Sequence, residues 1–280
     1  QEFSRKGTFV PQALTRIRLQ SRLLCLQALL REMPRAFRFP SGSRASRRLQ
    51  AAPKVLLREL RWLSVFGNRI MMQKPEDMEL FPPEEKGFSY IMLFDDGVKI
   101  DLTLLPVSML EEYLTRDKLV KIMLDKDNMI KTEIVPTDED YYIKCPTERK
   151  FDDCCNEFWN VATYVSKGLL RGEILFAIDH MNEVLHHELL RMISWYVGTE
   201  KGFNFSLGKN YKFLDKHISK ELWDNLLNTY SMSSYEEMWK SFDLCLCLFK
   251  KISKKVADSL GYNYPDYDEI VRRYEIQGIL

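Results

Sequence analysis

Two histidines and a glutamate in the second half of the chain stand where a metal site could be suspected. His180, Glu183 and His187 are spaced at i, i+3 and i+7, so on a helix they could share one face. The spacing is not that of the HExxH zinc motif, and no third strong ligand is evident. We therefore predict no zinc here.

A polar stripe lies slightly earlier in the chain. Asp153, Glu157, Asn160, Tyr164 and Lys167 fall at i, i+4, i+7, i+11 and i+14, which places them along one face of a helix. Such a stripe is most often a solvated face. On composition alone we predict a solvated face here.

A single aspartate stands out in a predicted hairpin. Residues 88–94 (FSYIMLF) and 98–105 (VKIDLTLL) flank an Asp-Asp-Gly turn, and Asp-Gly is a strong hairpin signal because Gly accepts positive φ. Side chains alternate along a strand, so Asp101 shares its face with Lys99 and Thr103. Asp101 is therefore expected on the more polar face of the sheet, either as a functional carboxylate or as an ordinary solvent-facing residue.

The C-terminal half must supply the elements that position the polar stripe. Ser234 followed by Glu237 forms a capping box, and Gly198 and Gly261 are expected helix stops. The expected helices lie near residues 149–170, 173–197, 219–230 and 235–259.

A shorter helix is predicted between the hairpin and this helical half. Pro106 ends the second strand, and Ser108 with Glu111 forms another capping box that would open a helix over residues 109–115. A polar connection near residues 126–148 follows. We place a domain boundary there, which gives a sheet-containing domain over 62–135 and a helical domain over 136–280.

The first sixty residues differ in composition from the rest. Residues 1–64 carry 14 Lys and Arg against three acids, whereas residues 65–280 carry 27 against 37. The net charge of +1 is therefore the sum of a basic segment and an acidic one. We expect residues 1–61 to be an atypical Arg-rich segment, foreign to the domain behind it. An Arg-rich segment could also bind RNA or a membrane surface, but only its charge supports that.

Composition excludes several classes of protein. Six cysteines without regular spacing fit neither a disulfide framework nor a CxxC zinc site. No apolar run approaches the roughly 18 to 20 residues that span a bilayer, and no signal peptide is evident. We expect a cytoplasmic protein with no membrane and no nucleic-acid partner; its oligomeric state is not predicted.

Long stretches of the chain resemble aminoglycoside 6-adenylyltransferases, over about residues 62–275. The resemblance is carried by MMQKPEDMELFPPEEKGFSYIMLFDDG, KIDLTLLP, KLVKIMLDKD, FDDCCNEFWNVATYVSKGL, EILFAIDHMNEVLHHELLRMISW and GKNYKFLDKHI. It implies an α+β fold, with a nucleotidyltransferase-like mixed-sheet domain followed by a C-terminal helical bundle domain. It also implies transfer of AMP from ATP to streptomycin with Mg²⁺, which results in antibiotic resistance.

The resemblance assigns roles to particular residues. Asp101 resembles the third metal-binding acid of the family, which helps to activate the acceptor hydroxyl. Asp153 and Glu157, with the rest of their stripe and with Asp179 and Glu183, become candidate contacts for the cationic drug. The candidate contacts for the nucleotide are Gly42, Ser43 and Arg44 as a phosphate-binding turn, Lys209, Lys212 and Tyr230.

One part of the family pattern is missing. Two alternate acids should follow the Gly-Ser turn on the next strand, but residues 53–57 are Pro-Lys-Val-Leu-Leu and Glu59 is the only acid between Arg44 and Glu76. Hard magnesium ions require such carboxylates. Two hypotheses therefore stand: an active aminoglycoside 6-adenylyltransferase, or a catalytically inactive derivative that binds drug or nucleotide weakly.

Overall fold

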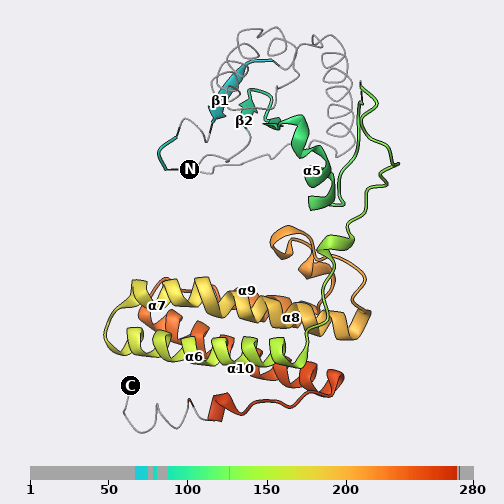
Figure 1. Cartoon of the computed structure of the whole chain (residues 1–280). Coiled ribbons are helices and arrows are strands. Elements are labelled where there is room, and N and C mark those ends of the chain that lie inside the picture. The colour runs from blue at the N-terminus through green and yellow to red at the C-terminus, as the bar shows by residue number, and fades with distance from the viewer. Residues whose placement is uncertain (1–66, 75–77, 81–87, 126, 270, 272–280) are drawn as a thin grey trace. The chain divides into compact units, whose positions relative to one another are not determined.

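The computed structural model describes residues 67–74, 78–80, 88–125, 127–269 and 271. The chain divides into two compact units, Gln1–Pro136 and Thr137–Leu280 (Figure 1). Within the described residues the first unit is a small sheet with one short α-helix, and the second is helical. This is the predicted α+β class. The expectations for residues 1–61 lie outside the described residues.

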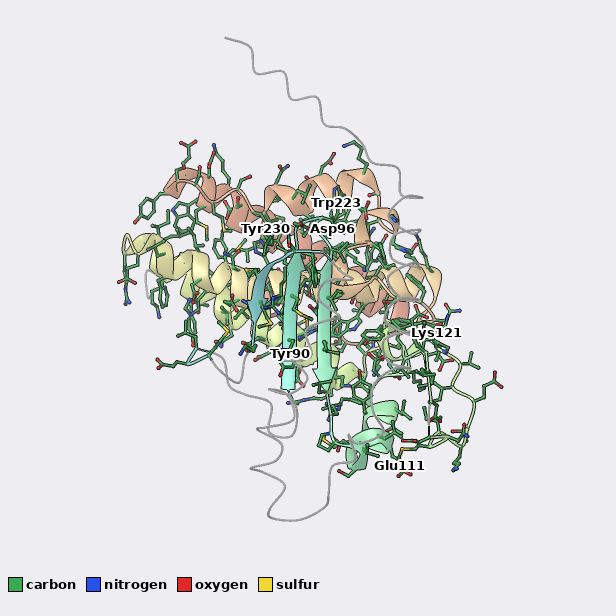
Figure 2. The ribbon with its side chains drawn as sticks, turned by 90° about the horizontal axis from the view of Figure 1, so that it is seen from above. Tyr90, Asp96, Glu111, Lys121, Trp223 and Tyr230 are labelled. Atoms are coloured by element: carbon green, nitrogen blue, oxygen red, sulfur yellow. The ribbon has the colours of Figure 1, made fainter. Side chains whose placement is uncertain are left out.

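The sheet of the first unit is antiparallel, with its strands in the order β1-β2-β3. Asp101 on β3 pairs with Ile91 on β2, which fixes the register of the hairpin. Figure 2 labels Asp96 in the turn that follows β2. Gly97 takes a φ of 79° there and donates its N–H to the carbonyl of Phe94 over 2.9 Å, so the predicted Asp-Gly hairpin is confirmed. The strands span Arg69–Gln73 (β1), Phe88–Phe94 (β2) and Lys99–Leu104 (β3).

One face of this sheet forms a small apolar core, and Asp101 lies on the other. Tyr90 (labelled in Figure 2), Met92 and Phe94 are buried on β2 and pack against alternate residues of β3. Exposure alternates residue by residue along β3, with Lys99, Asp101 and Thr103 exposed. The predicted polar face is therefore confirmed.

The short helix forms where it was expected, but its predicted cap is wrong. A 3-10 turn at Val107–Met109 precedes α5 (Leu110–Arg116), and Met109 occupies the N-cap without a side-chain hydrogen bond. The tight turn directly after Pro106 moves the start of the α-helix beyond Ser108. The Ser108 hydroxyl is then no longer at a position from which it could cap the first free N–H groups.

The helical unit follows the predicted spans closely. The region expected at 173–197 is one continuous helical path that changes to π-helical geometry for five residues, Met181–Leu185, before it becomes α-helical again. π-helical turns within α-helices often occur at functional sites. The elements are α6 (Glu148–Leu170), α7 (Ile174–His180), the π-helical segment η4 (Met181–Leu185), α8 (His186–Lys201), α9 (Lys220–Asn228) and α10 (Tyr235–Leu260).

Both ends of α10 match the sequence signals. The Ser234 hydroxyl accepts a hydrogen bond from the N–H of Glu237 over 3.2 Å, so the predicted cap is confirmed. The Glu237 carboxylate accepts from the N–H of Ser233 over 3.3 Å, one residue earlier than in the standard capping box. At the other end Gly261 has φ 69° and ψ 30°, the left-handed geometry that ends helices.

Gly198 was predicted to end a helix, and this prediction is wrong. The helix continues to Lys201, and Gly202, with φ 92°, ends it instead. Gly198 lies inside α8 because the ring of Phe203 packs directly on it: a Cβ atom at position 198 would lie 2.3 Å from Cε1 of that ring. The glycine therefore makes room for an aromatic side chain and does not terminate the helix.

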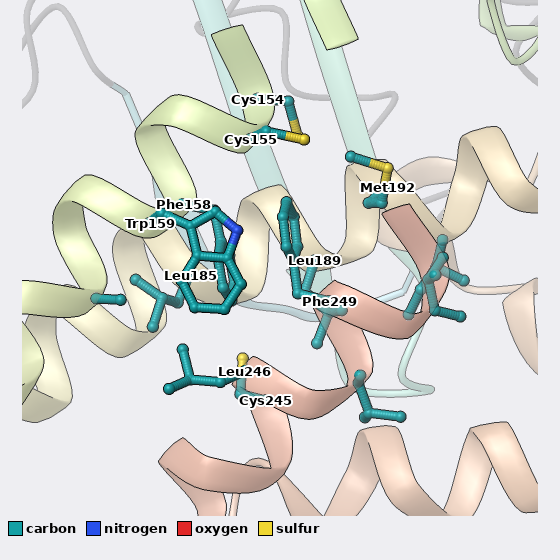
Figure 3. Packing of buried hydrophobic residues seen from close by; sticks show 14 of the residues in the cluster. Cys154, Cys155, Phe158, Trp159, Leu185, Leu189, Met192, Cys245, Leu246 and Phe249 are labelled. Carbon is teal, nitrogen blue, oxygen red and sulfur yellow. The ribbon is translucent and has the colours of Figure 1, made fainter. Parts of the chain in front are cut away.

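The core of the second unit lies among α6, α8 and α10. The rings of Phe158 and Phe249 stack with centroids 3.7 Å apart, and Trp159 contacts Phe249 edge-on (Figure 3). Leu189 and Met192 of α8 are fully buried in the same cluster. Burial of these large side chains fixes the face that α6 turns inward. Its opposite face carries the predicted polar stripe.

Within the described ranges no helix combines the length and the apolar composition that a bilayer crossing requires.

Candidate functional site

A pocket of about 690 Å³ opens in the helical unit. Residues 143–146, the first turns of α6 and part of α8 form its walls, and its size is typical of a small-molecule site. Its lining is rich in charge of both signs. The acids are Asp153, Glu157 and Glu188, and the bases are Lys144, Lys150 and Arg191.

Two of these acids belong to the predicted stripe, and the structure brings them together. Asp153 and Glu157 are one helical turn apart on α6 and line the same pocket. Asp153 is already engaged, since its Oδ1 lies 3.1 Å from Nε of Arg149. In the described part of the chain Glu157 has no ion-pair partner. Glu157 is therefore the pocket carboxylate whose charge is most available to a ligand.

The third acid, Glu188 on α8, was not singled out from the sequence. Its side chain is only 8% exposed, and both of its carboxylate oxygens accept hydrogen bonds from Nη1 of Arg191, at 2.8 and 2.6 Å. A buried carboxylate needs such a partner because desolvation of an unpaired charge is costly. The only sequence signal was the charged pair Glu188 and Arg191, three residues apart in the apolar run HELLRMISW.

A strained loop contributes a tyrosine near this ion pair. Gly208, Asn210 and Tyr211 have φ values of 76°, 55° and 58°, which is unusual for the two residues with side chains. Burial raises the pKa of Tyr211, the Arg191 guanidinium opposes that shift and the Glu188 carboxylate adds to it. The Tyr211 hydroxyl therefore lies within electrostatic reach of both. Backbone strain of this kind is concentrated at functional sites.

The predicted nucleotide contacts do not gather at the pocket. Lys209, in the 3-10 turn Lys209–Tyr211, is exposed, and Nζ of Lys212 lies 4.8 Å from the centroid of the Phe213 ring. Neither lysine lines the pocket, and the same is true of Tyr230. Gly42, Ser43 and Arg44 lie outside the described residues.

Tyr230 instead packs on a buried histidine. Its ring stacks on that of His186 with centroids 3.7 Å apart, and Nε2 of His186 lies 3.0 Å from Oγ1 of Thr229. Burial lowers the pKa of His186 to about 4, so the imidazole is neutral at neutral pH. His186 directly follows the π-helical segment, and we assign it a role in packing.

The remaining members of the stripe lie away from the pocket. Asn160, Tyr164 and Lys167 continue along α6, where the Tyr164 ring meets that of His180 edge-on, with centroids 5.6 Å apart. The stripe extends for several turns, whereas the pocket spans only the first turns of α6. The first part of the stripe therefore lines the pocket, and the rest lies outside it. Asp179 and Glu183, on α7 and η4, are exposed and do not line the pocket either.

Asp101 stands in the other unit. Its Oδ2 lies 3.4 Å from Nζ of Lys99, and the two side chains are 60% and 58% exposed. A magnesium site needs several fixed oxygen ligands. Among the described residues there is no group of three or more His, Cys, Asp or Glu that could hold a metal ion. Asp101 and its described neighbours therefore do not form a magnesium site by themselves.

Comparison with known proteins places the chain in a class of enzyme. It is 60% identical over 217 residues to an aminoglycoside 6-adenylyltransferase of Campylobacter jejuni, which covers 78% of this chain and 75% of that protein. It is 57% identical over 215 residues to the enzyme of the same name from Bacillus subtilis, covering 76% of each chain. These relatives are adenylyltransferases, that is, nucleotidyltransferases.

The family follows from a second comparison. The sequence model of the streptomycin adenylyltransferase family matches residues 52–277, and the chain therefore belongs to that family. A crystal structure of an aminoglycoside 6-adenyltransferase from Bacillus subtilis is 54% identical, covers 77% of this chain and 80% of its own, and superposes with a TM-score of 0.47. The family match begins ten residues before the expected start at residue 62.

Proposed function

We propose that the pocket of the helical unit binds the acceptor aminoglycoside and that this acceptor is streptomycin. The observation that carries the proposal is Glu157, a carboxylate without an ion-pair partner among the described residues, in a pocket that Asp153 and Glu188 also line. Streptomycin bears guanidinium and amine groups, which form charge-assisted hydrogen bonds with carboxylates. The names of the relatives and of the family support the choice of an aminoglycoside.

The reaction proposed for an intact family member is AMP transfer from ATP to a hydroxyl of the drug, with release of pyrophosphate. The hydroxyl must lose its proton as it attacks the α-phosphorus, and we assign Asp101 to that proton. Lys209 is assigned to the phosphates, because a lysine on a loop offers a mobile positive charge. ATP is available in the cytoplasm, where we place the protein.

A second function is favoured by one observation about the metal. The chemistry calls for magnesium held by several carboxylates, whereas Asp101 has no described acidic partner and residues 53–57 contain no acid. We therefore propose that this chain, as it stands, binds drug and nucleotide but transfers AMP poorly.

The drug site can be tested without any catalysis. We expect Glu157→Lys to weaken streptomycin binding about tenfold, because the substitution places a cation where the proposed ligand is cationic. Binding of ATP should change little. Isothermal titration calorimetry on the full chain with each ligand separates the two effects.

The matched control is Asp243→Lys, the same reversal at an exposed acid in α10 that does not line the pocket. It should leave both affinities unchanged. Unchanged streptomycin affinity in Glu157→Lys would mean that the α6 carboxylates are only a solvated face.

A further inference from the structure

We propose that Glu188 is the residue that makes this pocket prefer guanidinium-bearing aminoglycosides over those that carry only amines, and that Arg191 holds this subsite in the absence of drug. The inference rests on the proposed function, since it takes the pocket to be the drug site. It adds a specificity-determining residue that lies on α8, opposite the α6 carboxylates.

The geometry of the ion pair shows what kind of cation the subsite accepts. Arg191 is three residues after Glu188 on the same helix and reaches both carboxylate oxygens with a single nitrogen, Nη1. A guanidinium that approaches from the pocket can instead align two nitrogens with the two oxygens, which is the stronger arrangement. A ligand guanidinium that contacts Glu188 through two nitrogens is therefore a better partner than Arg191, which contacts it through one.

Burial explains why that partner should be a guanidinium. The Glu188 side chain is 8% exposed, so any cation that binds it must give up most of its water at that contact. A guanidinium is more weakly hydrated than an ammonium, and its planar shape matches a carboxylate. An amine gains less from the contact and loses more hydration. An amine can bind Glu157 with less loss of hydration, because that carboxylate is exposed.

The Arg191 side chain is able to move away from Glu188. It is 50% exposed at the pocket wall, so it can turn into water when a ligand takes its place. The protein's own guanidinium then acts as a competitor: it keeps Glu188 paired in the free protein and lowers the net gain of every ligand that must displace it. Only a ligand with a better cation at that position overcomes this, and selectivity is a difference of two such affinities.

The test compares two drugs on the full chain by calorimetry, streptomycin as the guanidinium-bearing ligand and kanamycin as the amine-only one. Glu188→Gln keeps the shape and removes the charge. We expect streptomycin affinity to fall about tenfold and kanamycin affinity by less than about threefold, so that the preference is largely lost. Equal effects on both drugs would overturn the inference.

Arg191→Met removes the competitor and is expected to raise streptomycin affinity about tenfold, with a smaller gain for kanamycin. The double variant with Glu188→Gln should lose that gain. A fall in streptomycin affinity on Arg191→Met would overturn the inference, since it would make Arg191 itself a drug contact. Arg191→Lys keeps a counterion for Glu188 and should show an intermediate gain if the Met variant does not fold.

The outcome also separates this inference from the proposed function. If Glu157→Lys weakens streptomycin binding while Glu188→Gln leaves the ratio of the two drug affinities unchanged, the pocket is the drug site and the role of Glu188 is wrong. If the unmodified chain binds neither drug, both fall together.

Discussion

At the scale of single residues, a substitution of Asp101 should affect AMP transfer without affecting the stability of the fold. The Asp101 side chain is 60% exposed on the open face of β3, so the Asp101→Asn change should leave the free energy of unfolding within about 0.5 kcal/mol. AMP transfer should be lost in any active form, because an amide cannot accept the acceptor's proton. Thermal melting and pyrophosphate release measure the two effects.

Lys99→Met is the matched control for that prediction. It removes the partner that lies 3.4 Å from Asp101 but leaves the carboxylate in place. In the same active form of the protein, transfer should continue in Lys99→Met. Activity retained by Asp101→Asn, or lost equally in Lys99→Met, would show that Asp101 matters only through its ion pair or not at all.

The residues that could be found from sequence are those whose environment follows from local spacing. Alternation placed Asp101 on the exposed face, and helical spacing placed Asp153 and Glu157 side by side on α6. Glu188 could not be found in this way, because a charge inside an apolar run has no fixed meaning until its partners are known. One of the groups with which it interacts electrostatically is Tyr211, in a loop more than twenty residues further along the chain.

At the scale of elements, Gly198 tests how tightly α8 packs on the segment that follows it. Ala has the higher helix propensity by roughly 1 kcal/mol, which would stabilise an open helix position. Here the added Cβ would lie 2.3 to 2.9 Å from three atoms of the Phe203 ring. We expect Gly198→Ala to lower the free energy of unfolding by about 1 to 2 kcal/mol, since overpacking outweighs propensity. Urea denaturation followed by circular dichroism measures it.

A double variant identifies the cause. Phe203→Ala removes the ring, so adding Gly198→Ala to it should be neutral or stabilising rather than destabilising. If Gly198→Ala alone stabilises the protein, the ring moves away without cost, and Gly198 does not set the packing of α8.

The elements themselves follow from the sequence because helix periodicity and caps are local. Ser234 caps α10 and Gly261 ends it, as predicted, since both signals act within one turn. The errors arose where something outside the local pattern decides. The 3-10 turn after Pro106 displaced the expected cap at Ser108, and the ring of Phe203 gave Gly198 a packing role that its position in the sequence does not reveal.

At the scale of the whole molecule, the family match divides the chain into a part that resembles the family and a part that does not. The family match covers residues 52–277 and leaves the Arg-rich residues 1–51 outside it. The pocket proposed for the drug lies within the helical unit, so the residues assigned to drug binding do not depend on the region before residue 62. The carboxylates for magnesium should come from the region before residue 62, where Glu59 is the only acid after Glu32. Binding and transfer should therefore be separable in this chain.

The last prediction is that the chain as written has little or no adenylyltransferase activity although it binds streptomycin. Magnesium beside a triphosphate needs fixed carboxylates, and Asp101 alone cannot hold the ions in place. Arginine can attract ATP, but it cannot ligate magnesium or accept a proton. The assay follows pyrophosphate release with magnesium, ATP and streptomycin. It compares the chain with a chimaera in which residues 1–61 are replaced by the corresponding segment of the Campylobacter jejuni relative.

Turnover in the chimaera should exceed that of the chain by at least about a hundredfold, because we expect the relative's segment to supply the two acids that this chain lacks. Streptomycin affinity should be similar in both, since the pocket residues do not change. Comparable turnover would mean that other acids replace the missing pair. Asp95 and Asp96 would then be the first to substitute, because they lie in the turn next to β3, although Oδ1 of Asp96 already accepts the N–H of Val98 over 3.1 Å. Loss of turnover in the unmodified chain on Asp95→Asn, with Asp96→Asn as the matched turn variant, would identify the substitute ligand.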